Sequence, residues 1–369
     1  MTNHRALAPP LISVIMPVRN EAAFIRRSLG SVLAQDYPPN RFEVLVADGQ
    51  STDGTCDVVR SFMANRPNLR VVENPGRIVS AGFNAALREA KGEIIVRVDG
   101  HTEIAADYLS QCVAELQRTG AGNVGGRMIA VGTGPFGRAV AAVTGSPFGV
   151  GGSRFHYSEL EEWVDTVYMG AWPCSVFDEV GLLDEELVRD QDDEFNYRLR
   201  AHGKRILLSP RIRSVYTTRS TPMSLWRQYF EYGYWKVRVT QMHPGQMRLR
   251  HFVPPAFVLA LLVSSGLAAS GRAGWFLGAL AAAYLVCSMV ASLALSPKVG
   301  WTLMPAMPVA FAIIHVGYGA GFLYGLIRFL NRWRDGGVMA SAKPKARVDP
   351  RRESVAGAGS RVQDGASER

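Results

Sequence analysis

The 369-residue chain has only four cysteines, and they lie far apart in the sequence. The four cysteines, Cys56, Cys112, Cys174 and Cys287, form no C-x-x-C pair, which argues against a metal cluster and a disulfide framework. We therefore expect a reducing compartment, the cytosol. The first ten residues lack an apolar core, and the apolar run after them breaks at Pro17, so we expect no signal peptide.

Charge is almost absent from residues 252–329, although the whole chain has a net charge of +9. No nucleic-acid-binding motif accompanies the positive charge, so we expect no nucleic acid partner. Basic residues instead flank the uncharged region on both sides: Lys236, Arg238, Arg248 and Arg250 before it, and Arg328, Arg332 and Arg334 after it. This pattern favours a membrane with an anionic surface.

The uncharged region divides into three apolar segments, at 253–270, 275–295 and 301–329. A helix that crosses a bilayer needs about 20 apolar residues, and the second segment fits this length best. The third contains Pro305, Pro308 and His315, and we expect it to be kinked or to lie partly in the membrane interface. The alternative is a set of buried helices in a soluble domain. We expect a catalytic domain at 1–251, a membrane region at 252–330 with two to three helices, and a basic disordered tail at 331–369.

The first part of the chain alternates apolar runs with amphipathic stretches. Strands are predicted at 11–16, 42–47, 69–72, 93–98 and 123–131, and helices at 21–34, 56–64, 78–90 and 106–118. This alternation predicts an α/β fold with a mostly parallel, Rossmann-like sheet and helices on both faces. Ligands of such sheets bind at the carboxyl ends of the strands, where polar residues follow the first, second and fourth runs.

The sequence RVDGHT at 97–102 places a carboxylate and an imidazole two residues apart at a strand end. Asp99 and His101 suit a divalent ion whose remaining positions are filled by phosphate oxygens. Gly100 between them would let the backbone approach such a phosphate. The alternative is structural, with Asp99 capping the next helix and His101 bonding locally.

The first two strand ends carry further candidates. Asp48 can accept a hydrogen bond from a base or a ribose hydroxyl, or it can simply turn the chain in its Asp-Gly pair. Glu21 begins a helix, where an acid is also favoured by the helix dipole. Arg19 is suited to pairing with phosphate.

A second acidic site lies at the predicted start of a helix that ends at His202. Its acids, Asp190, Asp192, Asp193 and Glu194, form either a solvated surface or part of the same crevice. A carboxylate that faces an acceptor hydroxyl can act as a general base, and Asp192 is our candidate. Arg198, on the same helix, is expected to hold the cluster in place.

Taken in series, these motifs resemble the family-2 glycosyltransferases, in particular the membrane-bound glucosyltransferases of bacterial succinoglycan-type exopolysaccharide assembly. The resemblance covers residues 11–235 and is carried by VIMPVRNE, VADGQSTDGT, RVDGHT, GLLDEELVRDQDDEFNYRLRAHG and WRQYFEYGYWK. It implies a GT-A fold, a UDP-sugar donor with glucose as the expected sugar, Mg²⁺ or Mn²⁺, and inversion at the anomeric carbon. It also implies a lipid-linked or saccharide acceptor and other glycan-assembly enzymes as partners. The implied location is the bacterial plasma membrane, multi-pass, with the catalytic domain in the cytoplasm.

The resemblance also assigns roles to residues of this chain. Pro17, Arg19 and Glu21 lie where the family binds uracil and ribose, and Asp48 matches its base-binding aspartate. Asp99 and His101 occupy the D-x-D position as a D-x-H variant, and Asp192 matches the catalytic base. Gln191 stands where the family often has Glu beside that base. Trp172 is either a platform for a sugar ring or a core residue, and Tyr232 and Trp235 are expected on the acceptor side with Arg198.

Two other functions remain open from the sequence. A sugar nucleotidyltransferase would carry a glycine-rich basic loop after the first strand, and PVRNEAAF is not such a loop. A catalytically degenerate membrane scaffold of a glycan assembly complex is the non-enzymatic alternative, and the intact Asp48, Asp99 and Asp192 argue against it. For the membrane region we expect two full spans and one interfacial segment, because three spans would place the basic tail outside, against the positive-inside rule.

Overall fold

The computed structural model describes residues 8–64 and 66–333. Its strands are β1 Ile12–Val18, β2 Phe42–Asp48, β3 Leu69–Glu73, β4 Ile94–Arg97, β5 Thr102–Ile104, β6 Asn123–Val131, β7 Glu162–Val164, β8 Tyr168–Pro173 and β9 Ile206–Thr217. Its α-helices are α1 Ile25–Leu33, α2 Thr55–Met63, α3 Val79–Glu89, α4 Tyr108–Thr119, α5 Gly134–Thr144, α6 Pro147–Val150, α7 Ser175–Val180, α8 Gln191–Ala201, α9 Pro222–Met242, α10 Leu249–Ala269, α11 Gly274–Val299 and α12 Ala306–Arg328.

The strands form one sheet in the order β3-β2-β1-β4-β8-β6-β9-β5, with β7 paired to β9. The strands β3, β2, β1 and β4 are parallel, as the apolar runs predict. Beyond β4 the sheet is mixed, because β8 runs antiparallel to both β4 and β6, and β5 and β7 run antiparallel to β9. The α/β fold class is confirmed, but the sheet as a whole is mixed, with parallel pairing in its first half.

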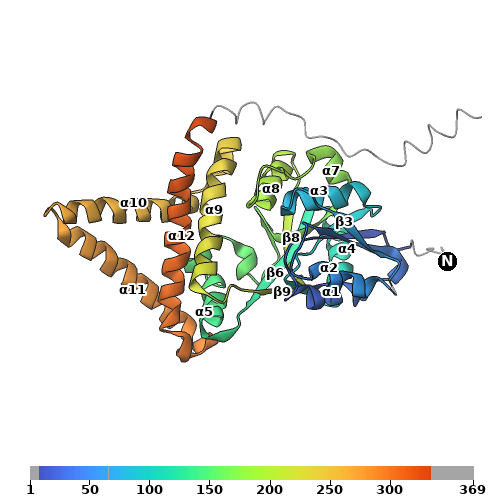
Figure 1. Cartoon of the computed structure of the whole chain (residues 1–369), viewed down its shortest axis with the longest axis horizontal. Coiled ribbons are helices and arrows are strands. Elements are labelled where there is room, and N and C mark those ends of the chain that lie inside the picture. Colours follow the sequence, from blue (N-terminus) through green and yellow to red (C-terminus); the bar gives the residue numbers. More distant parts are fainter. Residues whose placement is uncertain (1–7, 65, 334–369) are drawn as a thin grey trace, which may run out of the picture.

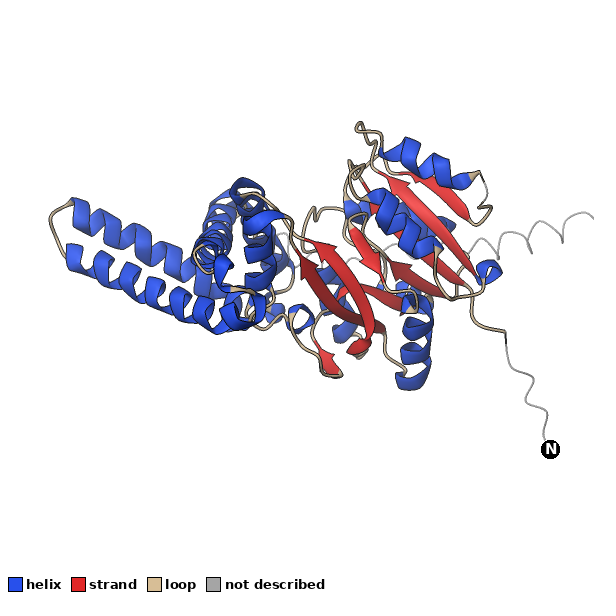
Figure 2. Cartoon of the chain, turned by 90° about the horizontal axis from the view of Figure 1, so that it is seen from below, coloured by secondary structure: helices blue, strands red, loops and turns tan. Residues whose placement is uncertain are grey.

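Helices cover both faces of the sheet, so its central strands β1 and β4 are buried on both sides (Figure 2). Along β1, Val14 and Met16 point into one apolar core with residues of α1, α2 and α4. The intervening Ile15 points into a second core with residues of α3, α7 and α8. Burial on both faces explains why β1 reads as a continuous apolar run.

The C-terminal part is helical, and α10, α11 and α12 are each long and apolar enough to cross a membrane. In Figure 1, α12 lies beside α9, while α10 and α11 form a hairpin that projects away from the sheet. Of the two alternatives for the third segment, the kink at Pro305 and Pro308 is wrong, and the interfacial position stays a prediction. These prolines occupy the N-cap and first turn of α12, where a missing N–H breaks no hydrogen bond, and the helix runs unbroken to Arg328.

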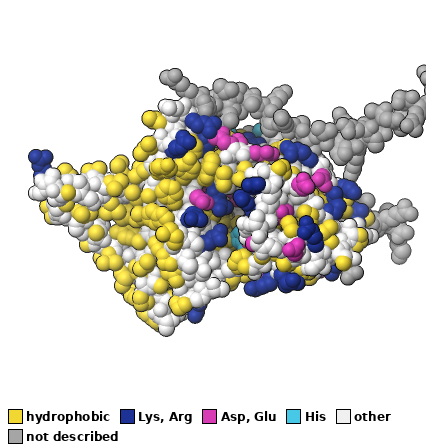
Figure 3. All heavy atoms as spheres, viewed as in Figure 1, with side chains coloured by type: hydrophobic (Ala, Val, Ile, Leu, Met, Phe, Trp, Pro, Cys, Tyr) yellow, Lys and Arg dark blue, Asp and Glu magenta, His cyan; other side chains and the backbone are white. Residues whose placement is uncertain are grey.

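Side chains of different character divide the surface into two parts. Figure 3 shows hydrophobic side chains gathered over α10, α11 and α12, and charged side chains over the sheet. Basic side chains gather near the boundary between the two parts. The described part of the tail ends at Trp333, and the remainder of the predicted basic tail lies outside the described residues.

Candidate active site

A cavity of about 1170 Å³ opens at the carboxyl ends of β1 and β4 and extends to α9, α10, α11 and α12. It brings together most of the residues that the sequence singles out. Those that line it are Pro17, Arg19, Glu21, Asp99, Gly100, His101, Asp192 and Tyr232. The strand ends and the acidic start of α8 therefore face one space, although they are far apart in the chain.

Glu21 and His101 form a pair at the first strand end. His101 Nδ1 lies 2.9 Å from Glu21 Oε1, and the imidazole packs edge-on against Tyr216 with a centroid distance of 5.3 Å. An imidazole that donates from Nδ1 to a carboxylate keeps its lone pair on Nε2, which is the arrangement of many metal-binding histidines. Gly100 leaves room for this contact, because a Cβ there would lie 3.0 Å from both Glu21 Cγ and Val18 Cγ1 and would crowd them.

Asp99 lies beside a buried arginine. Arg97 Nε donates to Asp99 Oδ1 at 2.8 Å, and the two side chains are 7% and 13% exposed. Burial alone would raise the pKa of Asp99, but Arg97 and His101 outweigh burial and hold the pKa below its usual range. Asp99 is therefore a carboxylate that stays ionised inside the cavity wall.

The donor atoms of Asp99 and His101 fit a divalent cation. An ionised carboxylate and an oriented imidazole supply two ligands, and a diphosphate would supply others. Within the described ranges, no group of three or more His, Cys, Asp or Glu residues is placed to hold a metal ion by itself. The protein part of such a site is thus incomplete without a phosphate-bearing ligand.

The acids at the start of α8 differ in their surroundings. Lys236 Nζ, from α9, donates to Asp193 Oδ2 at 2.5 Å and lies 3.6 Å from Asp190 Oδ1. Asp190 is the N-cap residue of α8, with a left-handed φ of 60°, and burial raises its pKa to about 7. Asp192 forms no ion pair with a cation within 4.0 Å among residues 8–64 and 66–333 and lines the cavity.

The environment of Asp192 suits a proton acceptor. Burial raises its pKa, Arg97 opposes this effect, and the charges of Asp193 and Asp99 add to it. The contribution of Asp99 shows that the two carboxylates are close enough to interact. A carboxylate with a raised pKa is a stronger base than an exposed one.

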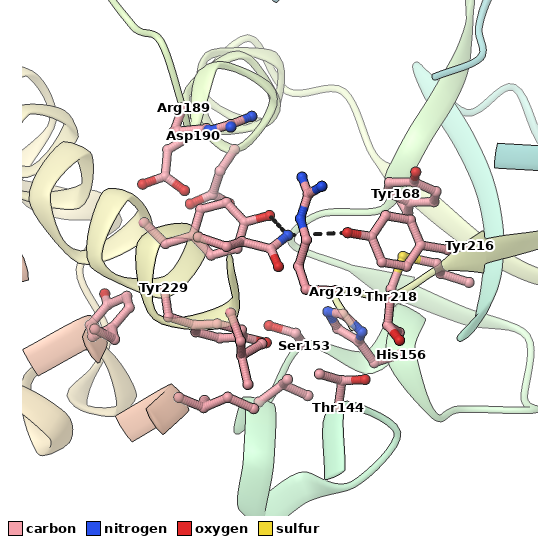
Figure 4. A pocket seen from close by; sticks show the side chains of 18 of the residues that line it. Thr144, Ser153, His156, Tyr168, Arg189, Asp190, Tyr216, Thr218, Arg219 and Tyr229 are labelled. Atoms are coloured by element: carbon pink, nitrogen blue, oxygen red, sulfur yellow. Dashed lines mark hydrogen bonds between the residues drawn. The ribbon is translucent and has the colours of Figure 1, made fainter. Parts of the chain in front are cut away.

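Several residues of the site were not predicted. Arg97 interacts with the charges of both Asp99 and Asp192. The sequence signal that could have indicated it is an arginine at the end of an apolar strand. Lys236 belongs to α9, the helix whose Tyr232 and Trp235 are expected on the acceptor side. Figure 4 shows Arg219 among the residues that line the cavity. The side chain of Gln228 donates to Tyr216 and to Tyr232, with distances of 3.1 and 3.0 Å.

Asp48 lies at the end of β2, in register with Val18 of β1, but it is not part of the cavity lining. Its Oδ2 accepts from Ser51 N at 3.0 Å. Burial raises the pKa of the nearby Cys56 thiol to about 11, and Asp48 contributes to this rise. Its role in binding a base stays a prediction.

Three of the residues expected on the acceptor side do not line the cavity, and that role is corrected here. Arg198 does pair with Glu194 of the acidic cluster, as expected. Trp172 is 4% exposed and packs among Phe83, Phe177 and Phe195, so it is a core residue. Arg198 is held by Glu194 and by the carbonyl oxygens of residues 180 and 182, which pin α8 to the preceding loop. Trp235 packs on Phe329 at the far side of α9. A sequence motif does not show which way a side chain points. That direction depends on the secondary structure and on the elements packed against it.

Comparisons with known proteins identify the family of this chain. Residues 13–176 match the family described as glycosyl transferase family 2. The chain is 30% identical over 326 residues to the succinoglycan biosynthesis protein ExoA of Rhizobium meliloti (strain 1021), covering 86% of this chain and 96% of that protein. The chain belongs to glycosyltransferase family 2.

Two further proteins are similar over most of their length. A dolichyl N-acetyl-alpha-D-glucosaminyl phosphate 3-beta-D-2,3-diacetamido-2,3-dideoxy-beta-D-glucuronosyltransferase of Methanococcus voltae is 27% identical, covering 86% of this chain and 97% of that protein. The mannosyltransferase PcManGT of Pyrobaculum calidifontis, solved with GDP-Man and Mn²⁺, is 22% identical with a TM-score of 0.52, covering 83% of this chain and 87% of that chain. This last likeness concerns the fold, and the expected GT-A fold is confirmed.

Proposed function

We propose that this glycosyltransferase moves a hexosyl group, with glucose as the first candidate, from a UDP-sugar to a saccharide hydroxyl, with inversion. The observation that carries this proposal is the cavity that Asp99, His101 and Asp192 share. Inversion needs a leaving group on one side of the anomeric carbon and a base near the nucleophile on the other. The strand ends of the sheet and the start of α8 are suited to these two roles.

The donor side of the proposal consists of strand-end residues. Pro17, Arg19 and Glu21 line the cavity where β1 ends, and Asp48 lies next to them at the end of β2. We assign uracil and ribose to these residues and the diphosphate to Asp99, Gly100 and His101. Asp99 and His101 would hold a Mg²⁺ or Mn²⁺ ion, which would neutralise the charge that develops on the leaving UDP.

The acceptor side of the proposal consists of Asp192 and Tyr232. Asp192 takes the proton from the acceptor hydroxyl while the new bond to the anomeric carbon forms and the bond to the UDP oxygen breaks. Arg97 holds Asp99 and partly opposes the rise that burial causes in the pKa of Asp192. The Gln228 side chain fixes the Tyr232 hydroxyl at the cavity wall.

We further propose the division into a catalytic domain at 1–251 and a membrane region at 252–330, with the catalytic domain in the bacterial cytoplasm, where UDP-sugars are made. The names of two relatives support a role in glycan assembly on a lipid-linked acceptor. One is a protein of succinoglycan biosynthesis, and the other a transferase named for a dolichyl-linked sugar phosphate. Other glycan-assembly enzymes are proposed partners.

The test is UDP release from a panel of UDP-sugars by the full chain in detergent, with membrane lipid extract as the acceptor source. We expect one donor to be turned over in the presence of Mn²⁺ or Mg²⁺ and not in EDTA. Asp99→Ala should abolish turnover and metal-dependent UDP binding, whereas His101→Asp should keep measurable activity because a carboxylate also binds hard cations. Unchanged turnover in EDTA would contradict the metal, and UDP binding without any turnover would favour the scaffold.

A further inference from the structure

The cavity has a wall of ring side chains that runs from His101 to His156. Tyr216 packs edge-on against His101, and Tyr168 packs edge-on against Tyr216 with a centroid distance of 6.0 Å. Phe155 stacks on Tyr168 at 6.3 Å, and His156 lies against Phe155 at 4.3 Å. All five side chains line the cavity. His156 therefore shares a continuous wall with the proposed metal-binding histidine.

His156 is an uncharged residue with an unpaired ring nitrogen. The residue is half-buried, and Figure 4 shows it among the side chains that line the cavity. Its Nδ1 is buried and has no hydrogen-bond partner in the described part of the chain. Burial lowers the pKa of His156 to about 4, so the imidazole is neutral at neutral pH. Its proton is favoured on Nε2, because a proton on Nδ1 would be a buried donor without an acceptor.

The chemistry of this imidazole suits a hydroxyl group of a ligand. Because Nδ1 is buried, Nε2 is the nitrogen that can face the cavity, and it carries the proton. A neutral N–H donates well to a hydroxyl oxygen, but it has no charge with which to compensate a phosphate. Aromatic walls with a few placed polar groups are typical of sites for small molecules, in which the polar groups provide specificity.

The segment 147–157 carries this histidine and is anchored at both ends. Near its start, Phe148 packs edge-on against His315 of α12, and His315 Nε2 donates to the carbonyl oxygen of Phe148 at 2.9 Å. At its end, the Tyr157 hydroxyl donates to the carbonyl oxygen of Gly151 at 3.0 Å. The imidazole is thus held in place before a ligand arrives, which reduces the entropy lost on binding.

We propose that His156 is a specificity-determining residue, which donates a hydrogen bond from Nε2 to a hydroxyl group of a hexose bound in the cavity. This inference rests on the proposed transferase function and adds a residue that recognises the sugar and not the nucleotide or its phosphates. The hexose belongs to the donor or to the acceptor, because both present the same hydroxyl chemistry. The experiment therefore measures the two substrates separately.

The experiment compares variants of the full chain in detergent. His156→Phe keeps an aromatic ring and removes both nitrogens, whereas His156→Gln keeps an amide N–H near the position of Nε2. The probes are UDP, the UDP-sugar that the unmodified chain turns over, and membrane lipid extract as the acceptor source. His156→Phe should raise the Kd of the UDP-sugar or the KM of the acceptor by about two- to tenfold, as expected for one lost neutral hydrogen bond, and leave the Kd of UDP unchanged.

Two comparisons sharpen this test. His156→Gln should recover part of the loss, and His202→Phe is the matched control, because His202 is exposed and does not line the cavity. Deoxy analogues of the UDP-sugar locate a contact on the donor side. The analogue that lacks the contacted hydroxyl should bind equally well to the unmodified chain and to His156→Phe, because both changes remove the same hydrogen bond. A rise in the acceptor KM alone assigns the contact to the acceptor.

Two results would overturn the inference. One is weaker binding of UDP itself by a His156→Phe chain that unfolds at the temperature of the unmodified chain, which would place the imidazole at the nucleotide or its phosphates. The other is a His156→Phe chain that binds UDP normally and shows no change in donor Kd or acceptor KM. His156→Ala repeats the test if His156→Phe does not fold. An unmodified chain that binds UDP but turns over no UDP-sugar would count against the transferase proposal instead.

Discussion

At the scale of single residues, Lys236 gives three neighbouring acids different surroundings. It lies close to Asp190 and Asp193 but forms no ion pair with Asp192. Burial would lower the pKa of Lys236, but Asp190 and Asp193 outweigh burial and raise it, so Lys236 stays charged. Asp193 is held ionised by that charge, because Lys236 more than offsets the effect of its burial. Asp192 is left facing the cavity with no cation of its own in an ion pair among the residues described, which makes it the acid available for chemistry.

The first prediction at this scale concerns Asp192→Asn. We expect the rate of transfer to fall by roughly 10²-fold or more, because the acceptor hydroxyl loses its general base. Donor affinity should stay near that of the unmodified chain, since Asp192 belongs to α8 and the proposed uracil residues follow the end of β1. Steady-state UDP release and titration of UDP binding measure the two effects separately. If Asp192→Asn is active and Asp193→Asn is inactive, the base is the neighbouring acid.

The pH profile of kcat/KM adds a second prediction for Asp192. The ionised form is the base, so activity should be lost as pH falls through the pKa of this group. Because burial raises that pKa, the acidic limb should lie above the value of about 3.9 for a free aspartate. An acidic limb at or below that value would contradict the assignment. Donor binding, measured over the same pH range, distinguishes this effect from loss of the nucleotide.

The residues that sequence could predict are those fixed by a strand end. Asp99 and His101 follow an apolar run directly, so the topology of a parallel sheet places them at its carboxyl edge. Lys236 was not predicted, because it reaches the acids only after α9 has docked against the start of α8. Trp172 was left open in the sequence because a buried strand residue and a surface platform look alike without knowledge of which face is covered.

At the scale of elements, local patterns predicted the parallel half of the sheet and missed the mixed half. The strands β1 to β4 are continuous apolar runs separated by amphipathic helices. β8 is not signalled in this way, since its place between β4 and β6 depends on pairing across distant parts of the chain. The three-residue strands β5 and β7 are too short to produce a periodic pattern.

The contact between α9 and α12 depends on a stripe of glycines along α12. Gly317, Gly321 and Gly325 recur every four residues along α12 and face α9. A Cβ at Gly321 would lie 2.0 Å from the carbonyl oxygen of Phe230, and one at Gly325 would lie 2.8 Å from that of Tyr234. Small residues at this spacing let two helix backbones approach closely, which is how apolar helices associate in lipid.

The prediction at this scale is that Gly321→Leu separates α9 from α12. We expect destabilisation of about 1–3 kcal/mol or more, because the added side chain overlaps the backbone of α9. Gly278→Leu on α11 is the matched control, because nothing lies within 4 Å of a Cβ there. Thermal unfolding of both variants in detergent measures the difference. A Gly321→Leu chain that unfolds at the same temperature as Gly278→Leu would mean that the close approach is not needed.

At the scale of the whole molecule, the directions of the apolar helices bear on how the chain meets a membrane. α12 lies along α9 and is the most buried of the three candidate spans. α10 and α11 are largely exposed and form a hairpin that projects across the direction of α12 (Figures 1 and 2). If the hairpin enters the bilayer, α9 and α12 lie near its surface, beside the basic side chains at the boundary seen in Figure 3.

This arrangement predicts that the catalytic domain and the C-terminus are on the same side of the membrane, with two helices crossing. Single cysteines in an otherwise cysteine-free chain test it with a membrane-impermeant maleimide in intact bacterial cells. Ser270→Cys, at the exposed tip of the hairpin, should be labelled from outside. Ser360→Cys, which lies outside the described residues, should be labelled only after lysis. Labelling of both in intact cells would mean that α12 also crosses, and labelling of neither would mean that the hairpin does not reach the far side. The first pattern alone satisfies both the hairpin geometry and the positive-inside rule, because it keeps the basic residues after α12 in the cytoplasm.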